Sequence, residues 1–490
     1  MTSTTTTPKT GGLVFTLAFA GISASIMQTM VTPLIPQLPR IFDTSSSNTA
    51  WVVTVTLLAA AVAVPIAGRL GDIVGKRQMI IACAVPLIIG SIICALAPSV
   101  LVMIIGRGMQ GLGMGVVPLG VALLRDVVPP EKLSSSIALV SATMGIGGAI
   151  GLPIASAVAE YADWRVLFWG AAGLAAVAAT FVFFKVPSVP SQAKGQRVDL
   201  VGAIGLAAGL VSLLLAVSKG ATWGWTSVTT ITLFVAAVVL FAVWGWWELR
   251  TRDPLVDLRT TARPRVLMTN IASVFIGFGM YASMLVIPQV LQFPTQTGYG
   301  LGQSLLQAGL WMAPSGVMMM IVSPLGAKLT VARGAKTTLV TGALVIAVGY
   351  AASLGLMGTT WGLMIVGMIV NSGVGLAYGA MPTLIMSAVP RSETAAANGF
   401  NTLMRSLGTT IGAAVIGVIL SQVTTDFGGT AIASENGFRI ALIAGGGITL
   451  VAAVLAAVIP AVRTKAAEPS QAPVVDVSTG SVGIPEPAGR

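Results

Sequence analysis

Long apolar stretches, separated by short groups of charged, Pro, Gly or Asn residues, follow one another along almost the whole chain. A helix needs about 20 mainly apolar residues to cross the hydrocarbon core of a bilayer. The first stretch lacks the small-residue cleavage site of a signal peptide, so we expect it to be retained. The pattern predicts fourteen transmembrane helices, at about residues 13–36, 48–68, 78–97, 100–123, 133–158, 165–184, 199–217, 227–247, 266–291, 303–327, 337–356, 361–385, 395–421 and 437–460.

The composition supports this prediction and excludes several kinds of chemistry. Of the 490 residues, 55% are hydrophobic and 9% are charged, whereas a soluble domain carries about 25% charged residues. A water-soluble enzyme is therefore excluded. The chain has no His, which removes imidazole bases and most zinc sites. Cys83 and Cys94 share one predicted helix about 16 Å apart, too far for a disulfide. We expect no metal, no cofactor and no enzymatic activity.

The net charge of +11 reflects an uneven distribution of Lys and Arg. When both chain ends are placed on one side of the membrane, that side carries 21 of the 27 basic residues. The other side carries four, and Arg107 and Arg405 lie inside predicted helices. Because cytoplasmic loops are enriched in basic residues, we predict a multi-pass protein of a bacterial-type inner membrane with both termini cytoplasmic, and no nucleic-acid partner. Residues 1–12 are predicted to form a cytoplasmic tail, and 461–490 a disordered one.

The two halves of the chain match each other weakly but in the same order. The Pro-Gln pair at 36–37 recurs at 288–289, and the segment 65–77 recurs at 324–336. Repeated halves of this kind are typical of transporters in which one half rocks against the other around a central site. We therefore predict an all-α membrane fold with two pseudo-symmetric six-helix bundles, at 13–190 and 264–460, and an inserted helix pair at 198–250.

The most specific motif lies between the second and third predicted helices, where the sequence reads Gly68-Arg-Leu-Gly-Asp72-Ile-Val-Gly75-Lys76-Arg77. Glycines permit a tight turn, and Asp72 can pair with a basic residue or with the amino terminus of a helix. The motif is similar to the G-x-L-x-D-x-x-G-K-R loop of the major facilitator superfamily, and the chain resembles its fourteen-helix drug:proton antiporters. The resemblance implies the major facilitator fold and a conformational latch formed by Gly68, Asp72, Gly75, Lys76 and Arg77.

A second motif lies in the fourth predicted helix. Arg107-Gly-Met-Gln110-Gly-Leu-Gly113 is similar to the R-x-x-Q-G-x-G motif of the same family. Arg107 lies roughly 13 Å into its helix, so it should face the protein interior and have acceptors. Two interpretations stay open. Arg107 binds an anionic substrate group or modulates a proton site, or it is a structural residue bonded to backbone carbonyls and Gln28.

One position departs from the family pattern. Many fourteen-helix antiporters have an aspartate in the first helix, where this chain has Met27. None of the 16 acidic residues lies clearly in the middle of a predicted helix. A buried carboxylate is the natural carrier of a coupling proton and the natural partner of a cationic drug. Strong selection for multivalent cations is therefore not expected, and the possible proton-coupling residues are Arg107, Asp126 and Asp72.

The repeat also predicts which helices line the cleft between the halves. These are helices one, two, four and five and helices nine, ten, twelve and thirteen. Their polar, aromatic and pliable side chains are the predicted substrate-binding residues, namely Met27, Gln28, Thr32, Arg107, Gln110, Tyr281, Trp311, Asn371 and Tyr378. Arg405 in the thirteenth helix is interpreted as structural.

These observations predict a secondary active transporter that moves small amphipathic or hydrophobic compounds by alternating access. Export of the drug or antibiotic type, and coupling to proton entry, are implied by the resemblance. The alternatives are a sensor or scaffold of the same fold that does not transport and, with less support, a membrane-embedded enzyme. An ATP-driven pump is disfavoured because the segment from Gly71 to Lys76 is one residue too short for a phosphate-binding loop. We expect a monomer whose partners are the lipid bilayer, a small-molecule substrate and a proton.

Overall fold

The computed structural model describes residues 10–35, 37–191, 193, 195–428 and 430–460. In this part of the chain, fourteen helical segments are long and apolar enough to cross a membrane. They confirm the predicted all-α membrane fold. The predicted tail at 461–490 and residues 1–9 lie outside the described residues. The helices are α1 (Thr10–Thr29), α4 (Trp51–Val74), α5 (Lys76–Ala95), α6 (Val100–Leu112), α7 (Val116–Val127), α8 (Pro130–Tyr161), α9 (Arg165–Lys185), α10 (Leu200–Trp223), α11 (Val228–Arg250), α13 (Pro264–Gln292), α14 (Leu305–Arg333), α15 (Ala335–Leu356), α16 (Thr360–Met386), α17 (Thr394–Gln422) and α18 (Glu435–Val458).

Short elements connect these helices. They are η1 (Thr32–Leu34), α2 (Leu38–Ile41), α3 (Ser46–Thr49), α12 (Leu258–Thr261), η2 (Thr295–Thr297), η3 (Arg391–Glu393), β1 (Thr424–Phe427) and β2 (Thr430–Ala433). The two strands form an antiparallel hairpin in which Thr424 pairs with Ala433 and Phe427 pairs with Thr430. The hydrophobic pattern did not predict this hairpin, because it is a short polar segment between two long apolar ones.

The fourth span consists of two helices, α6 and α7, that are separated at Gly113. A Cβ atom at Gly113 would lie 2.5 Å from the carbonyl oxygen of Cys83 in α5. Only a glycine allows such a close approach between two backbones. The glycines of the second sequence motif therefore position the turn between α6 and α7 against α5.

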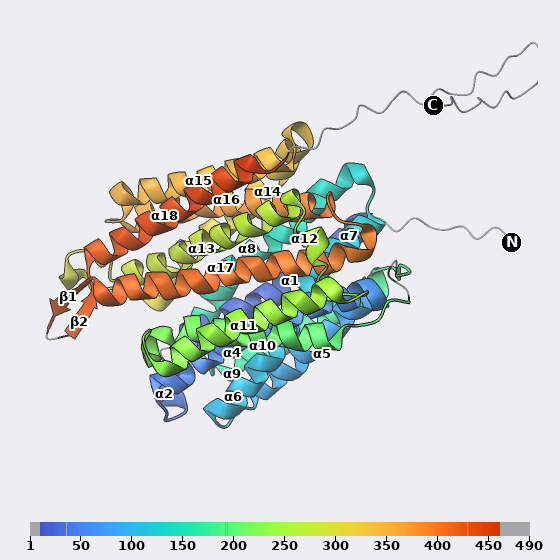
Figure 1. The fold of residues 1–490 in the computed structure, drawn as a ribbon. Helices are drawn as coiled ribbons and strands as arrows, with labels where there is room; N and C mark the ends of the chain where they lie inside the picture. The colour runs from blue at the N-terminus through green and yellow to red at the C-terminus, as the bar shows by residue number, and fades with distance from the viewer. Residues whose placement is uncertain (1–9, 36, 192, 194, 429, 461–490) are drawn as a thin grey trace, which may run out of the picture. The chain divides into compact units, whose positions relative to one another are not determined.

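Two large cores hold the helices together. One consists mainly of apolar side chains from α1 to α9, and the other of side chains from α13 to α18. The helices of the two cores meet where α4 packs along α17 and where α8 packs along α14. In Figure 1 the blue and cyan helices lie beside the yellow to red ones. This arrangement agrees with two halves, although the domain boundaries at 13–190, 198–250 and 264–460 stay a prediction.

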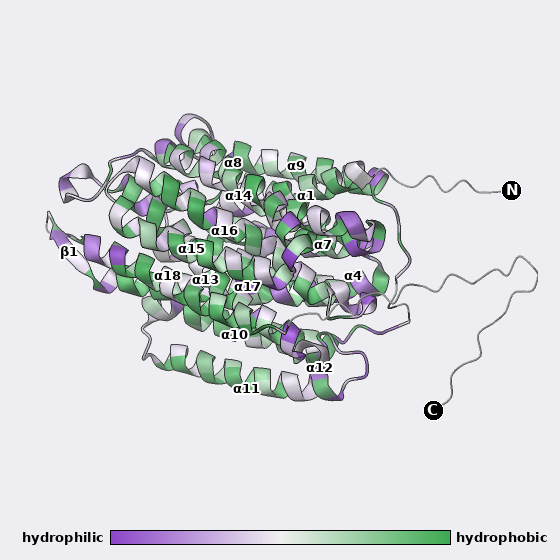
Figure 2. Cartoon of the chain, turned by 90° about the horizontal axis from the view of Figure 1, so that it is seen from above, coloured by the Kyte–Doolittle hydropathy of each residue, from purple (hydrophilic) through white to green (hydrophobic). Residues whose placement is uncertain are grey.

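The inserted helices α10 and α11 pack against each other, and α10 also contacts α4 and α17. Along α11 many apolar side chains face outward, and Val228 and Val238 are 82% and 69% exposed. Such side chains are stable in contact with lipid rather than water. Hydrophobic residues cover most of the long helices in Figure 2, whereas hydrophilic residues are more frequent toward the helix ends.

The fourteen spans alternate in direction, so the start of α1 and the end of α18 lie at the same side of the bundle. We call this side the terminal face, and the side that carries the β1–β2 hairpin the opposite face. The end of α4 and the start of α17 both lie at the terminal face. The candidate functional site extends from this face to a cavity between the two halves that lies nearer to the opposite face.

Candidate functional site

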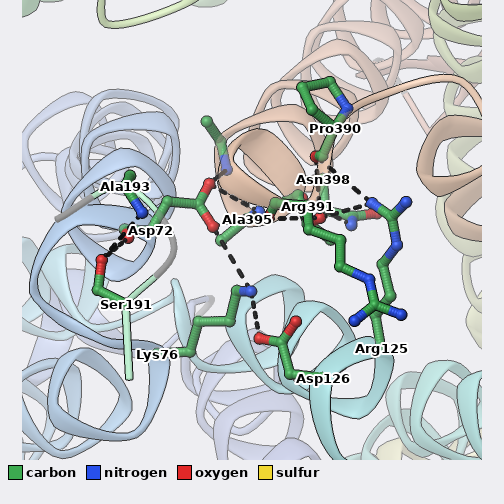
Figure 3. A network of polar contacts seen from close by, with 12 residues as sticks. Asp72, Lys76, Arg125, Asp126, Ser191, Ala193, Pro390, Arg391, Ala395 and Asn398 are labelled. Carbon is green, nitrogen blue, oxygen red and sulfur yellow. Dashed lines mark hydrogen bonds and ion pairs between the residues drawn. The ribbon is translucent and has the colours of Figure 1, made fainter. Parts of the chain in front are cut away.

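The carboxylate of Asp72, in the last turn of α4, binds the first turn of α17. It accepts hydrogen bonds from the backbone N–H of Ala395, at 2.9 and 3.1 Å, and of Ala396, at 2.8 Å (Figure 3). The first N–H groups of a helix have no partner within the helix, and the helix dipole favours a negative charge at this end. Asp72, which belongs to the first half, therefore caps the start of α17 in the second half.

Lys76, at the start of α5, lies between two carboxylates. Its Nζ lies 3.6 Å from Asp72 Oδ1 and forms a short ion pair with Asp126 of α7. The three side chains are at most 6% exposed, and Asp126 Oδ1 is buried without a hydrogen-bond partner among the described residues. The turn that carries Lys76 back toward Asp72 needs Gly75, which has a φ angle of 120° that residues with a side chain rarely adopt. One buried cation is thus shared by two anions.

Further contacts close the terminal face. A Cβ atom at Gly68 would lie 2.5 Å from the carbonyl oxygen of Ala395, so α4 and α17 approach each other closely here. Arg125 of α7, which is labelled in Figure 3, donates to Thr394 Oγ1 at 2.7 Å and to the Val389 carbonyl at 3.1 Å. With Asp72 and Gly68, these contacts join the two halves at the terminal face, and we call this group of contacts the latch.

A cavity lies between the two halves on the other side of the latch. The volume of this cavity is about 160 Å³. Its walls come from α1, α8, α13, α14 and α16, in the parts of these helices that are nearer to the opposite face. The lining residues are Ser25, Gln28, Thr29, Met144, Gly145, Gly148, Ala149, Leu152, Met280, Ser283, Met284, Ile287, Trp311, Met312, Ser315, Gly316, Met319, Leu363, Met364, Gly367, Asn371 and Tyr378. This lining, taken from the described residues, is mainly apolar and includes no acidic side chain.

Arg107 is fully enclosed within the first half. Its guanidinium donates to the Met27 carbonyl at 3.0 Å, to the Val52 carbonyl at 3.3 Å and to Gln110 Oε1 at 2.7 Å. Gln110 in turn donates to Ser91 Oγ at 2.7 Å. These bonds tie α6 to α1, α4 and α5, and they supply the acceptors that a charge inside a membrane requires.

A sequence model described as the Major Facilitator Superfamily matches residues 17–413. The chain belongs to the major facilitator superfamily. The superfamily comprises transporters rather than enzymes, and both the resemblance and the expected absence of enzymatic activity are thereby confirmed. The fourteen helices and the packing of α4 on α17 and of α8 on α14 are this superfamily's fold with an additional helix pair.

Two curated relatives illustrate the similarity to other major facilitator proteins. The multidrug resistance protein Stp of Mycobacterium tuberculosis (strain CDC 1551 / Oshkosh) is 30% identical over 398 residues, which cover 80% of this chain and 72% of the relative. The multidrug transporter protein MdtP of Bacillus subtilis (strain 168) is 24% identical over 414 residues, which cover 84% and 74%. The crystal structure of the human organic anion transporter MFSD10 (TETRAN) has a TM-score of 0.66 at 14% identity and covers 92% of this chain and 100% of that one. At this identity the structural likeness concerns the fold alone.

The structure divides the predicted substrate-binding residues of this major facilitator protein into two groups. Four of them line the cavity, namely Gln28, Trp311, Asn371 and Tyr378. The other five do not line it, namely Met27, Thr32, Arg107, Gln110 and Tyr281. Met27 is wholly buried in the first core, and the polar groups of Arg107 and Gln110 are bonded to each other and to neighbouring helices.

The predicted latch residues also differ in what they contact. Gly68 and Asp72 reach the second half directly. Lys76 holds Asp72 and Asp126 together within the first half. Arg77 donates to the carbonyl of Phe183 in α9, and its guanidinium lies 5.4 Å from the ring centre of the same residue. Among the described residues, these contacts of Arg77 connect α5 to α9 within the first half.

Several cavity residues were not singled out from the sequence, above all the methionines Met280, Met284, Met312, Met319 and Met364. A signal for them exists. Met280 and Met284 are four residues apart, and Met312 and Met319 are seven apart, so each pair shares one face of a helix. Periodicity shows that such residues share a face, but it does not show whether that face meets lipid, a neighbouring helix or a cavity.

Proposed function

We propose that this protein is a secondary active transporter that exports small amphipathic or hydrophobic compounds by alternating access, coupled to proton entry. The observation that carries the proposal is a mainly apolar cavity that is lined by both halves and separated from the terminal face by the latch. A transporter requires this combination because its substrate site must be reachable from only one side at a time. Membership of the superfamily and the relatives named for multidrug resistance support the proposal.

The orientation follows from the distribution of basic residues. If both termini are cytoplasmic, as the excess of Lys and Arg at that side predicts, the latch closes the cytoplasmic side and the cavity lies in the external half of the membrane. This is the state in which an exporter has released its substrate outward. We propose that the protein works in this way as a monomer in the plasma membrane.

The cavity lining suits substrates that differ in shape. Met144, Met280, Met284, Met312 and Met319 provide flexible and polarizable surface that can adapt to varied apolar groups. Polar groups are few, and they include the side chains of Gln28, Asn371 and Tyr378. A mainly apolar pocket with a few polar groups that fix orientation is the usual form of a small-molecule site.

The latch offers a physical basis for proton coupling. Asp72 holds α17 through hydrogen bonds that its negative charge strengthens, so protonation of Asp72 would weaken the latch and favour opening of the terminal face. Loss of the proton would restore the charge and close that face again. Net proton entry results if the proton reaches Asp72 or Asp126 from the cavity side and leaves at the terminal face.

Arg107 can connect the two parts of the site without touching substrate. It bonds the backbone of Met27, which precedes the cavity residue Gln28 in α1, and the backbone of Val52 in α4, the helix that ends in Asp72. A movement of α1 at the cavity would thus act on the helix that carries the latch. We propose that this is how Arg107 contributes to coupling.

A flux assay tests the proposal. The purified protein is reconstituted in vesicles, a pH gradient is imposed, and the movement of cationic, neutral and anionic amphipathic compounds is followed. We expect movement of at least one compound that the gradient drives and that Asp72→Asn greatly weakens. The matched control is Asp163→Asn, because the Asp163 side chain is 58% exposed and lies outside the latch and the cavity.

The results would also separate transport from the alternative. If the folded protein moves no compound of the panel with or without the gradient, a sensor or scaffold of the same fold is favoured. If compounds move equally well without a pH gradient and in the Asp72 variant, transport stands and proton coupling through the latch is refuted.

A further inference from the structure

Arg405 is a second buried arginine, and the bonds it makes are much weaker than those of Arg107. It lies about 16 Å along α17 from the first residue of that helix, which places it near the middle of the span. Its side chain is 8% exposed. The guanidinium lies 4.3 Å from the ring centre of Tyr378 and 3.9 Å from the sulfur of Met144.

These two partners are poor compensation for a full charge. Arg107 donates to three oxygen atoms, whereas the Arg405 guanidinium has no oxygen acceptor and no ion pair within the described part of the chain. An aromatic face and a thioether attract a cation only moderately. Because a charge inside the membrane is costly unless polar groups compensate it, the positive potential around Arg405 is largely uncompensated.

Arg405 lies where its positive potential can act on a molecule that moves between the terminal face and the cavity. A small pocket on the latch side of the cavity is lined by Arg405 together with Ser141, Asn398, Asn401 and other residues of α7, α8, α16 and α17. Tyr378 and Met144 line both this pocket and the main cavity. They form a partition between the two, so a molecule that moves from the terminal face to the cavity passes Arg405.

The described residues that line the two spaces carry no charge opposite to that of Arg405. The described lining of the cavity and of the small pocket includes no Asp and no Glu. Asn398 donates its amide to the Thr394 carbonyl, and Asn401 donates to Asn270 and Ser273. The guanidinium therefore has no carboxylate of the protein to pair with here, although its planar donors suit a carboxylate or sulfonate well.

We propose that Arg405 selects substrates that carry one acidic group next to an apolar body. The acidic group binds the guanidinium at the partition, and the apolar body lies among the methionines of the cavity. Compounds of the same shape with a cationic group are disfavoured, because two positive charges would come close together in a medium of low polarity. This inference rests on the proposed transport function and specifies its substrate class.

The test uses three ligands of nearly the same shape, namely 1-naphthoate, 1-naphthamide and 1-naphthylmethylammonium. Binding to the full-length protein in nanodiscs is measured by calorimetry at neutral pH. For the wild type we expect naphthoate to bind at least tenfold more tightly than the amide, and the ammonium compound to bind most weakly. Arg405→Gln should lose at least tenfold in naphthoate affinity and less than twofold in amide affinity, and Arg405→Lys should lie between wild type and Arg405→Gln.

The control is Arg165→Gln, because the Arg165 side chain is 44% exposed and lines neither the cavity nor the small pocket. If Arg405→Gln does not fold, the wild-type preference for naphthoate and its reduction in Arg405→Lys decide the question. Equal wild-type affinity for naphthoate and naphthamide, or an equal loss for both in the variants, overturns the inference but leaves transport standing. A wild type that neither binds nor moves any compound counts against the proposed function itself.

Discussion

The latch can be tested by removing the charge of Asp72 with little change in shape. In Asp72→Asn the side chain keeps one acceptor oxygen, while its NH2 group faces N–H donors of α17 that it cannot bind. Lys76 retains Asp126 as a partner, so the substitution leaves no buried cation alone. The change therefore acts mainly on the contact between α4 and α17.

The size of the effect follows from the bonds that are lost. A hydrogen bond to a charged group contributes about 1.5–3 kcal/mol, and a charge at the amino terminus of a helix contributes about 0.3–1 kcal/mol more. Loss of one such bond and of the charge then costs roughly 2–4 kcal/mol. The bonds exist only while the terminal face is closed, so this energy shifts the equilibrium toward the open form by about 30- to 700-fold.

Distances between spin labels can measure this shift. Glu131 at the start of α8 and Arg333 at the end of α14 are exposed at the terminal face on opposite halves, and each is replaced by Cys and labelled. The native Cys83 and Cys94 are buried and should remain unlabelled. Asp72→Asn should move most molecules to a longer label distance, whereas Asp163→Asn should not. The same distance distribution in wild type and Asp72→Asn would refute the latch.

Three other substitutions test separate parts of the site. Lys76→Met removes the buried ion-pair partner of Asp72 and Asp126. We expect a loss of about 3–5 kcal/mol in stability, seen as a lower thermal unfolding temperature that Asp126→Asn partly restores. Gly68→Val places a side chain against the backbone of α17, and it should reduce flux and lengthen the label distance at the terminal face. Arg107→Ala should abolish flux while the protein remains folded in the membrane, as checked by gel filtration and a vesicle assay.

Each of these variants has a matched control. Lys185 is exposed at the end of α9, so Lys185→Met should leave the unfolding temperature unchanged. A Cβ atom at Gly170 meets nothing within 4 Å, so Gly170→Val should leave the label distance unchanged. Arg165→Ala is the control for Arg107→Ala and should leave the flux unchanged. An unchanged unfolding temperature in Lys76→Met, an unchanged label distance in Gly68→Val, or wild-type flux in Arg107→Ala would each contradict the corresponding role.

The sequence predicted the local motifs of the site but not the contacts that its residues make with distant helices. The motif from Gly68 to Arg77 was found because its residues are adjacent in the chain, yet nothing in it says that Asp72 caps a helix more than 300 residues away. Arg107 and Arg405 are both single arginines in long apolar segments. The sequence left a functional and a structural role open for the first, and it indicated a structural role for the second. Their acceptors, which lie on other helices, are what distinguishes them.

The sequence by itself determined that the chain crosses a membrane fourteen times and which segments do so, because the bilayer requires about 20 apolar residues in each helix whatever the helix packs against. It also determined the chain's family, since the motif glycines and charges occupy fixed local positions. Only the tertiary structure decided which faces of the helices meet. It placed Gln28, Trp311, Asn371 and Tyr378 at the cavity and buried Met27 in a core. In a chain that is apolar almost throughout, hydrophobicity does not distinguish lipid-facing, core and cavity positions, and the packing between distant helices does.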